Sequence, residues 1–221
     1  MKIIHTGVLY TQYLQYLMKR TILIFSTLLL LTACGATTSN VGTSTNMATQ
    51  TQTGPPKSGE QIAVVKTNMG TIKIKFFPQY APETIKNFTE LAKKGFFDGL
   101  IFHRVIPDFM IQGGDPLGTG YGGETYKGPG THLPGEVSDK VTHVLGAVSM
   151  ANSGSPDTAS SQFFIVQNRA GAHFLDGKYT IFGQAYEGLD TVDAIANTPR
   201  DANDKPKSKV TMEKITLETV P

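Results

Sequence analysis

The 221-residue sequence contains no tryptophan and only one cysteine, which excludes a disulfide within the chain. Its formal net charge is only +2, and its lysines are scattered among acidic residues, so no basic patch indicates nucleic-acid binding. The histidines lack the paired spacing of metal ligands, and no Gly-x-Ser-x-Gly motif of a serine hydrolase occurs. The stretch 118–123 fits the Gly-x-Gly-x-x-Gly pattern, but it lacks the preceding strand and following helix of a dinucleotide site. We therefore expect no metal and no other cofactor.

Residues 1–33 have the features of a signal region. The apolar run 22–31 is too short to span a bilayer comfortably. A Lys-Arg pair stands just before it, as positive charges precede the apolar part of a signal peptide. Residues 1–17 fit no part of a signal peptide, and we hypothesise that translation naturally starts at Met18.

The end of this region, Leu-Thr-Ala-Cys at 31–34, resembles the bacterial lipobox. The resemblance implies cleavage before Cys34 and diacylglycerol on its sulfur, which would anchor the protein outside the cytoplasm. The anchor would lie in the cell membrane, or in the outer membrane of a cell that has two. A plain secretory signal with an incidental cysteine is the alternative. Residues 34–60 are mostly small and polar and cannot bury enough surface to offset the entropy of ordering. They predict a flexible linker to a domain at 61–221.

The domain begins with a predicted β-hairpin and a helix. Residues 62–67 and 70–76 have the composition of strands joined by a turn. A helix is expected from Pro82, which suits a first helical position, to Gly95, which suits the C-cap. Further strands are expected at 144–150, 162–166, 180–185 and 210–219, and a second helix at 189–196. Short strands, two helices and many turns predict a mainly β fold, a closed antiparallel barrel.

The stretch 102–115 places a charged residue, Arg104, among apolar strand formers. A Pro-Asp turn signal within it predicts a hairpin bent at 107–109. A loop of that length puts Arg104 opposite Gln112, with Met110 on the same face. The Gln112 amide oxygen can then accept a hydrogen bond from the guanidinium. The alternative is an arginine held at a sheet edge by packing alone.

Three stretches in order resemble the cyclophilin family of peptidyl-prolyl cis-trans isomerases over roughly residues 61–220. The first is the hairpin. The others are Ser-Met-Ala-Asn at 149–152 with Ser-Gln-Phe-Phe-Ile at 161–165, and Phe-Leu-Asp-Gly-Lys-Tyr-Thr-Ile-Phe-Gly at 174–183. The resemblance implies an eight-stranded barrel with a helix over each end, a packed interior and a substrate groove on the outer face.

The resemblance also implies roles for individual residues. Arg104 would be the catalytic donor to the prolyl nitrogen of a twisted amide, and Gln112 would orient it. The backbone at Asn152, next to Ala151, would bind the residue before proline. Side chains expected at the proline pocket are Phe109, Met110, Phe164, Phe174 and Leu175, with Tyr179 at its edge. Without the resemblance, each apolar one of these would be interpreted as a core residue.

The sequence departs from the family at two of these positions. Many members have tryptophan where this chain has Phe174, and several have histidine where it has Tyr179. Family members bind cyclosporin in this groove, and we expect that affinity to be weakened here while isomerisation is kept.

The function expected is therefore a monomeric, lipid-anchored isomerase that assists the folding of exported, proline-containing polypeptides. The alternative is a chaperone or surface receptor module that binds proline segments, with incidental turnover. The identity of the client proteins is left open.

Overall fold

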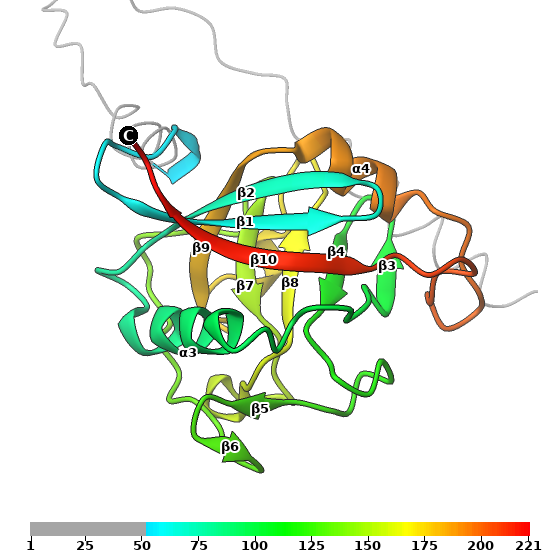
Figure 1. Ribbon diagram of the computed structural model, residues 1–221, viewed down its shortest axis with the longest axis horizontal. Helices are drawn as coiled ribbons and strands as arrows, with labels where there is room; N and C mark the ends of the chain where they lie inside the picture. The colour runs from blue at the N-terminus through cyan, green and yellow to red at the C-terminus, as the bar shows by residue number, and fades with distance from the viewer. Residues whose placement is uncertain (1–51) are drawn as a thin grey trace, which may run out of the picture. The chain divides into compact units, whose positions relative to one another are not determined.

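The computed structural model describes residues 52–221, which fold around one curled antiparallel sheet (Figure 1). The predicted signal region, the Met18 start, Cys34 and most of the linker lie outside the described residues. The eight strands of the sheet are β1 (Gln61–Thr67), β2 (Gly70–Phe76), β3 (Arg104–Ile106), β4 (Met110–Gly113), β7 (Ala147–Met150), β8 (Phe163–Val166), β9 (Ile181–Glu187) and β10 (Met212–Thr219). Their spatial order is β10-β1-β2-β9-β7-β8-β4-β3.

The mainly β fold with two helices is confirmed, but the predicted closure of the barrel is overstated. Strands β3 and β10 stand at the two ends of the sheet order and share no ladder. The outer edge of β3 contacts a different segment, because Val105 N donates to Asp204 O at 2.8 Å. The chain before β3 meets β10 through the bridge Ile101↔Thr211 and a hydrogen bond from Phe102 N to Val210 O, 2.9 Å long. The sheet is thus a half-barrel, and β3 keeps one edge outside the ladder.

The two helices lie at opposite ends of this half-barrel in Figure 1. Helix α3 (Pro82–Lys93) begins with Pro82 as predicted, and its buried Phe88 packs into the core. A residue distant in sequence caps its first turn: the Glu136 carboxylate accepts hydrogen bonds from the backbone N–H groups of Glu83 and Thr84 at 2.9 and 2.8 Å. Helix α4 (Leu189–Ala196) has the predicted bounds. No helix within residues 52–221 is long and apolar enough to cross a membrane.

Alternation along the strands separates two groups of apolar side chains. Ile111 of β4 and Ile165 of β8 belong to the main core inside the half-barrel. Their neighbours Met110 and Phe164 belong to a second cluster. A strand that buries one face in the core therefore presents its other face to the site described below.

Some local structure differs from the prediction. Strand β7 begins at Ala147, later than expected, because Gly146 before it has a φ of 79° and interrupts extended backbone. The glycine-rich stretch after β4 contains a small hairpin, β5 (Glu124–Thr125) and β6 (Gly128–Pro129). Two single turns of 3₁₀-helix, η1 (Pro156–Thr158) and η2 (His173–Leu175), were also not predicted.

Candidate active site

The β3–β4 hairpin has the predicted register, with Arg104 paired to Gln112 and Ile106 to Met110. Its bend places Asp108 at a φ of 57°, a left-handed conformation that aspartate tolerates better than most residues. The Asp108 N–H donates to Gln167 Oε1 at 2.7 Å and fixes the bend to the chain beyond β8. The position of Arg104 therefore follows from a short, pinned turn.

A chain of side-chain amides orients the partner of Arg104. Arg104 Nη1 donates to Gln112 Oε1 at 3.5 Å, a long hydrogen bond. Gln112 Nε2 donates to Gln162 Oε1 at 2.9 Å, and Gln162 Nε2 donates to Gly122 O at 2.7 Å. The amide nitrogen of Gln112 is thus occupied, so its oxygen faces the guanidinium. Gln162 lies inside one of the recognised motifs, but its orienting role was not predicted.

A groove of about 710 Å³ opens beside this hairpin on the outer face of the sheet. The predicted residues that line it are Arg104, Phe109, Met110, Gln112, Ala151, Asn152, Phe164, Leu175 and Tyr179. Met110, Phe164 and Leu175 are buried, and Arg104 keeps its side chain 42% exposed. The groove therefore joins an apolar pocket to a fixed positive charge.

Phe174 is the one predicted site residue that does not line this groove. It is 64% exposed and packs its ring on Phe109, with ring centroids 5.5 Å apart. It stands on η2, directly before the lining residue Leu175. Phe174 therefore extends the apolar surface beyond the rim.

A polar network that runs from buried His143 to the surface supports the turn that carries Phe174 and Leu175. Asp176 accepts hydrogen bonds from His143 N at 2.8 Å, and its oxygens lie 2.7 Å from His143 Nδ1 and 2.9 Å from His173 Nδ1. Burial opposes ionisation of Asp176, but these hydrogen bonds outweigh it and lower the pKa of the carboxyl group. The pKa of His143 is lowered by burial, against the opposing effect of Asp176. The network joins η2 to the segment before β7.

The glycine-rich wall of the groove is organised by one carboxylate. Asp115 accepts hydrogen bonds from the backbone N–H groups of Leu117, Thr119 and Gly120 at 2.8, 2.8 and 2.6 Å. Burial opposes ionisation of Asp115, but these bonds lower the pKa of its carboxyl group. These backbone N–H groups therefore bind the Asp115 carboxylate, which holds the loop together.

The far end of the groove contains residues that the sequence did not single out, namely His103, Tyr121, Asp201, Asn203 and Lys205. His103 is buried, neither of its ring nitrogens has a hydrogen-bond partner within residues 52–221, and burial lowers its pKa. The last three belong to the loop between α4 and β10, which walls the groove beyond Arg104. In the same described range, no three His, Cys, Asp or Glu side chains gather as metal ligands.

The family model "Cyclophilin type peptidyl-prolyl cis-trans isomerase/CLD" matches residues 62–217. A "Putative peptidyl-prolyl cis-trans isomerase" of Staphylococcus aureus (strain USA300) is 42% identical over 188 residues, covering 73% of this chain and 94% of that protein. A "Putative bifunctional phosphatase/peptidyl-prolyl cis-trans isomerase" of Streptococcus pyogenes is 42% identical over 178 residues, 68% of this chain. The chain spans only 37% of the length of this second relative.

Solved structures agree with the sequence relatives. The crystal structure of a cyclophilin type peptidyl-prolyl cis-trans isomerase of Cryptosporidium parvum superposes with a TM-score of 0.69 at 35% identity, covering 73% of this chain and 99% of that one. The same parasite protein, crystallised in the presence of the dipeptide Ala-Pro, superposes with a TM-score of 0.67 at 34% identity, covering 72% and 99%.

Proposed function

This chain belongs to the cyclophilin-type peptidyl-prolyl cis-trans isomerase family, and from that premise we propose that it accelerates rotation about X–Pro bonds in exported proteins. Its clients are unfolded or partly folded polypeptides, and it acts on them as a monomer. The observation that carries the proposal is the Arg104 guanidinium, which donates to Gln112 and lines the same groove as the buried apolar side chains of Met110, Phe164 and Leu175.

The chemistry asks for little beyond a well-placed donor. Rotation about an X–Pro bond has a barrier of about 18–20 kcal/mol and takes tens to hundreds of seconds without a catalyst. In the twisted amide the prolyl nitrogen becomes pyramidal and localises its lone pair. Arg104 donates to that lone pair and stabilises the twisted state more than either planar state, which lowers the barrier. No bond to substrate forms or breaks.

The apolar pocket holds the ring while the rest of the peptide turns. Met110, Phe164 and Leu175 give buried walls, and Phe109 and Tyr179 close the sides. The proline ring is small and apolar, so it gains from leaving water here. Ala151 and Asn152 also line the groove. Their backbone would bind the residue before proline.

We also propose that the protein works outside the cytoplasm, anchored by lipid on Cys34. The lipobox-like 31–34 and the small, polar composition of the linker predicted at 34–60 support this part of the proposal. The described end of that linker packs on the domain, because buried Gln52 donates to Thr142 O at 2.7 Å and Gly59 N donates to Val220 O at 2.9 Å, so only the part before residue 52 is proposed as the tether. The linker would let the groove reach chains that emerge near the membrane.

NMR exchange spectroscopy on a short Ala-Pro peptide tests the activity. Catalytic amounts of the full chain are expected to produce cis–trans exchange cross-peaks on a timescale of seconds or faster, whereas the free peptide shows none. A folded protein that binds the peptide but produces no exchange would instead favour the binding module.

A further inference from the structure

The guanidinium of Arg104 has a second neighbour besides Gln112. Asp204 Oδ2 lies 3.9 Å from Arg104 Nε, on the opposite side of the guanidinium from the Nη1 that donates to Gln112. Both side chains are partly exposed, so the attraction between them is modest. At 3.9 Å the contact is an ion pair beyond hydrogen-bond distance, and it favours orientations of the guanidinium that keep Nε near the carboxylate while Nη1 contacts Gln112.

Asp204 is tied to the strand that carries Arg104. The backbone N–H of Val105, the next residue in β3, donates to Asp204 O at 2.8 Å. This bond uses the edge of β3 that lies outside the sheet ladder. Figure 1 shows the segment between α4 and β10 beside β3, at the right of the view. The separation of Arg104 and Asp204 is therefore set by backbone contacts.

The loop that presents Asp204 is itself braced. Asp201 Oδ1 accepts hydrogen bonds from the backbone N–H groups of Asn203 and Lys205 at 2.8 and 3.0 Å. Lys205 Nζ donates to Gly118 O at 3.1 Å and connects the loop to the opposite wall of the groove. Asp204 has a φ of 62°, a left-handed conformation that aspartate and asparagine adopt more readily than other non-glycine residues.

A second arginine shares the same carboxylate. Arg200 Nε lies 3.1 Å from Asp204 Oδ1, so the two oxygens of Asp204 face two different guanidinium groups. Arg200 is not among the residues that line the groove. The carboxylate therefore contacts Arg200 within the loop through Oδ1 and faces Arg104 at the groove through Oδ2, while its backbone is placed independently by the bond to Val105 N.

We propose that Asp204 is a positioning residue for Arg104 in the isomerisation reaction. The inference rests on the proposed role of Arg104 as donor to the prolyl nitrogen. Gln112 contacts Nη1 and Asp204 attracts the Nε side of the guanidinium, so that the terminal nitrogen Nη2 is left for the twisted amide. Without Asp204 the side chain samples more rotamers, and a smaller fraction of it is aimed at the substrate.

Asp204→Asn in the full chain tests this, since asparagine keeps the shape and tolerates the left-handed backbone. We expect kcat for an Ala-Pro peptide to fall by roughly threefold to tenfold with KM changed by less than about twofold, because alignment rather than binding is lost. The ¹⁵N–¹H resonance of Arg104 Nε should shift or broaden in the variant. An unchanged kcat together with an unchanged resonance would overturn the proposal.

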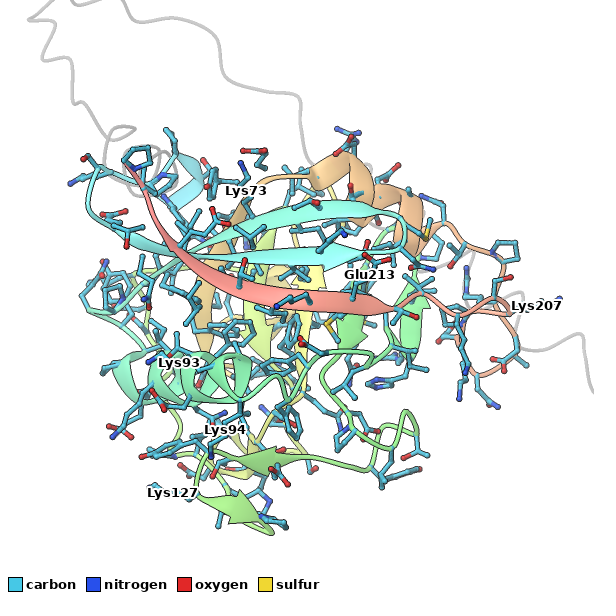
Figure 2. The ribbon with its side chains drawn as sticks, viewed as in Figure 1. Lys73, Lys93, Lys94, Lys127, Lys207 and Glu213 are labelled. Carbon is cyan, nitrogen blue, oxygen red and sulfur yellow. The ribbon has the colours of Figure 1, made fainter. Side chains whose placement is uncertain are left out.

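Two controls separate positioning from a purely structural role. Arg200→Gln removes the other partner of Asp204, and Lys207→Gln changes a charge on the same loop whose side chain points away from the barrel in Figure 2. Both should leave kcat within about twofold of wild type. If Arg200→Gln lost as much activity as Asp204→Asn, the pair would act only by holding the loop, and the proposal would be wrong.

The Arg104→Ala background distinguishes the positioning role of Asp204 from the proposed donor role of Arg104. In that background, adding Asp204→Asn should cause no further loss, because the group it positions is gone. A further loss of the same size would overturn the positioning role while leaving the proposed mechanism intact. Full activity of Arg104→Ala itself would instead overturn the mechanism.

Discussion

The imidazole of His143 lies parallel to the ring of Phe164, with ring centroids 5.8 Å apart and 11° between the planes. Phe164 is a buried wall of the pocket proposed to hold proline, and His143 is fully buried. His143 Nδ1 lies 2.7 Å from Asp176 Oδ1, and Nε2 lies 3.1 Å from Ser149 Oγ. The pocket wall therefore rests on a polar group whose charge depends on pH.

The burial of His143 predicts that stability falls as the solution is acidified. The folded-state pKa of His143 lies below its ordinary value of 6.5, so the unfolded chain binds more protons as pH drops through that value. The pKa of Asp176 lies below 3.8 when folded, so its contribution has the same sign and is lost only at lower pH. Urea denaturation at pH 7.5 and pH 5 should show a lower free energy of unfolding at pH 5.

His143→Gln provides the comparison for this slope. The variant should be less stable at pH 7.5, because glutamine does not reproduce the stacked ring, but its stability should change less between pH 7.5 and pH 5. His132→Gln, at an exposed histidine, should keep the wild-type slope. An equally steep slope in His143→Gln would show that another group causes it.

Arg104→Ala is expected to lower kcat/KM by roughly 10²–10³, since one pre-aimed donor is worth about 3–4 kcal/mol. The residue lies at a short edge strand with its side chain partly exposed, so the fold should survive. NMR exchange on an Ala-Pro peptide measures the rate, and circular dichroism checks the fold. Arg169→Ala, at an exposed arginine outside the groove, is the matched control and should keep full activity. Activity of Arg104→Ala within threefold of wild type would contradict the mechanism.

Cys34→Ser is expected to release the protein from the membrane and leave the isomerase active. Serine cannot form the thioether to lipid, and the described domain begins well after this position. Detergent-phase partitioning of whole-cell extracts measures the release, and the exchange assay measures activity. Equal retention of wild type and variant in the detergent phase would show that a different anchor holds the protein.

Local sequence signals predicted the hairpin of the site correctly, but they could not predict contacts between residues distant in sequence. Arg104 and Gln112 are separated by a short turn, so turn chemistry and strand alternation were sufficient to pair them. Gln162, which orients Gln112, directly precedes β8 and lies 50 residues away from Gln112 in the sequence. Only the fold brings these amides together, and no spacing rule links them.

Contacts between segments distant in sequence also determine where the sheet ends and which second residue lies beside Arg104. The composition predicted short strands and two helices, but not that β3 would contact the chain around Asp204 at its outer edge and form no ladder with β10. In the sequence, Asp204 is one acidic residue in a polar loop. Only the fold brings it to Arg104, because this loop runs along the outer edge of β3 and Asp204 O accepts a hydrogen bond from Val105 N.

The position of Phe174 makes the last prediction specific. Its ring is largely exposed and packs on Phe109 at the rim of the groove, so a larger indole can replace it without entering the core. In many family members a tryptophan here donates its indole N–H to a carbonyl group of cyclosporin. Phenylalanine keeps the apolar surface but has no donor, which would leave that carbonyl short of a partner at a cost of about 1–3 kcal/mol.

We therefore expect an active enzyme that resists cyclosporin, and Phe174→Trp should tighten inhibition by roughly 5–150-fold at about 1.4 kcal/mol per tenfold. The value of kcat/KM should change little, because the proposed donor for isomerisation is Arg104. The wild-type chain has no tryptophan, so both forms are compared by inhibition of the exchange assay. Phe174→Leu is the control, since it keeps an apolar side chain without a donor and should not tighten inhibition. If Phe174→Trp left the inhibition constant unchanged, the missing N–H would not explain the resistance, and Tyr179 at the edge of the pocket would be the next residue to exchange.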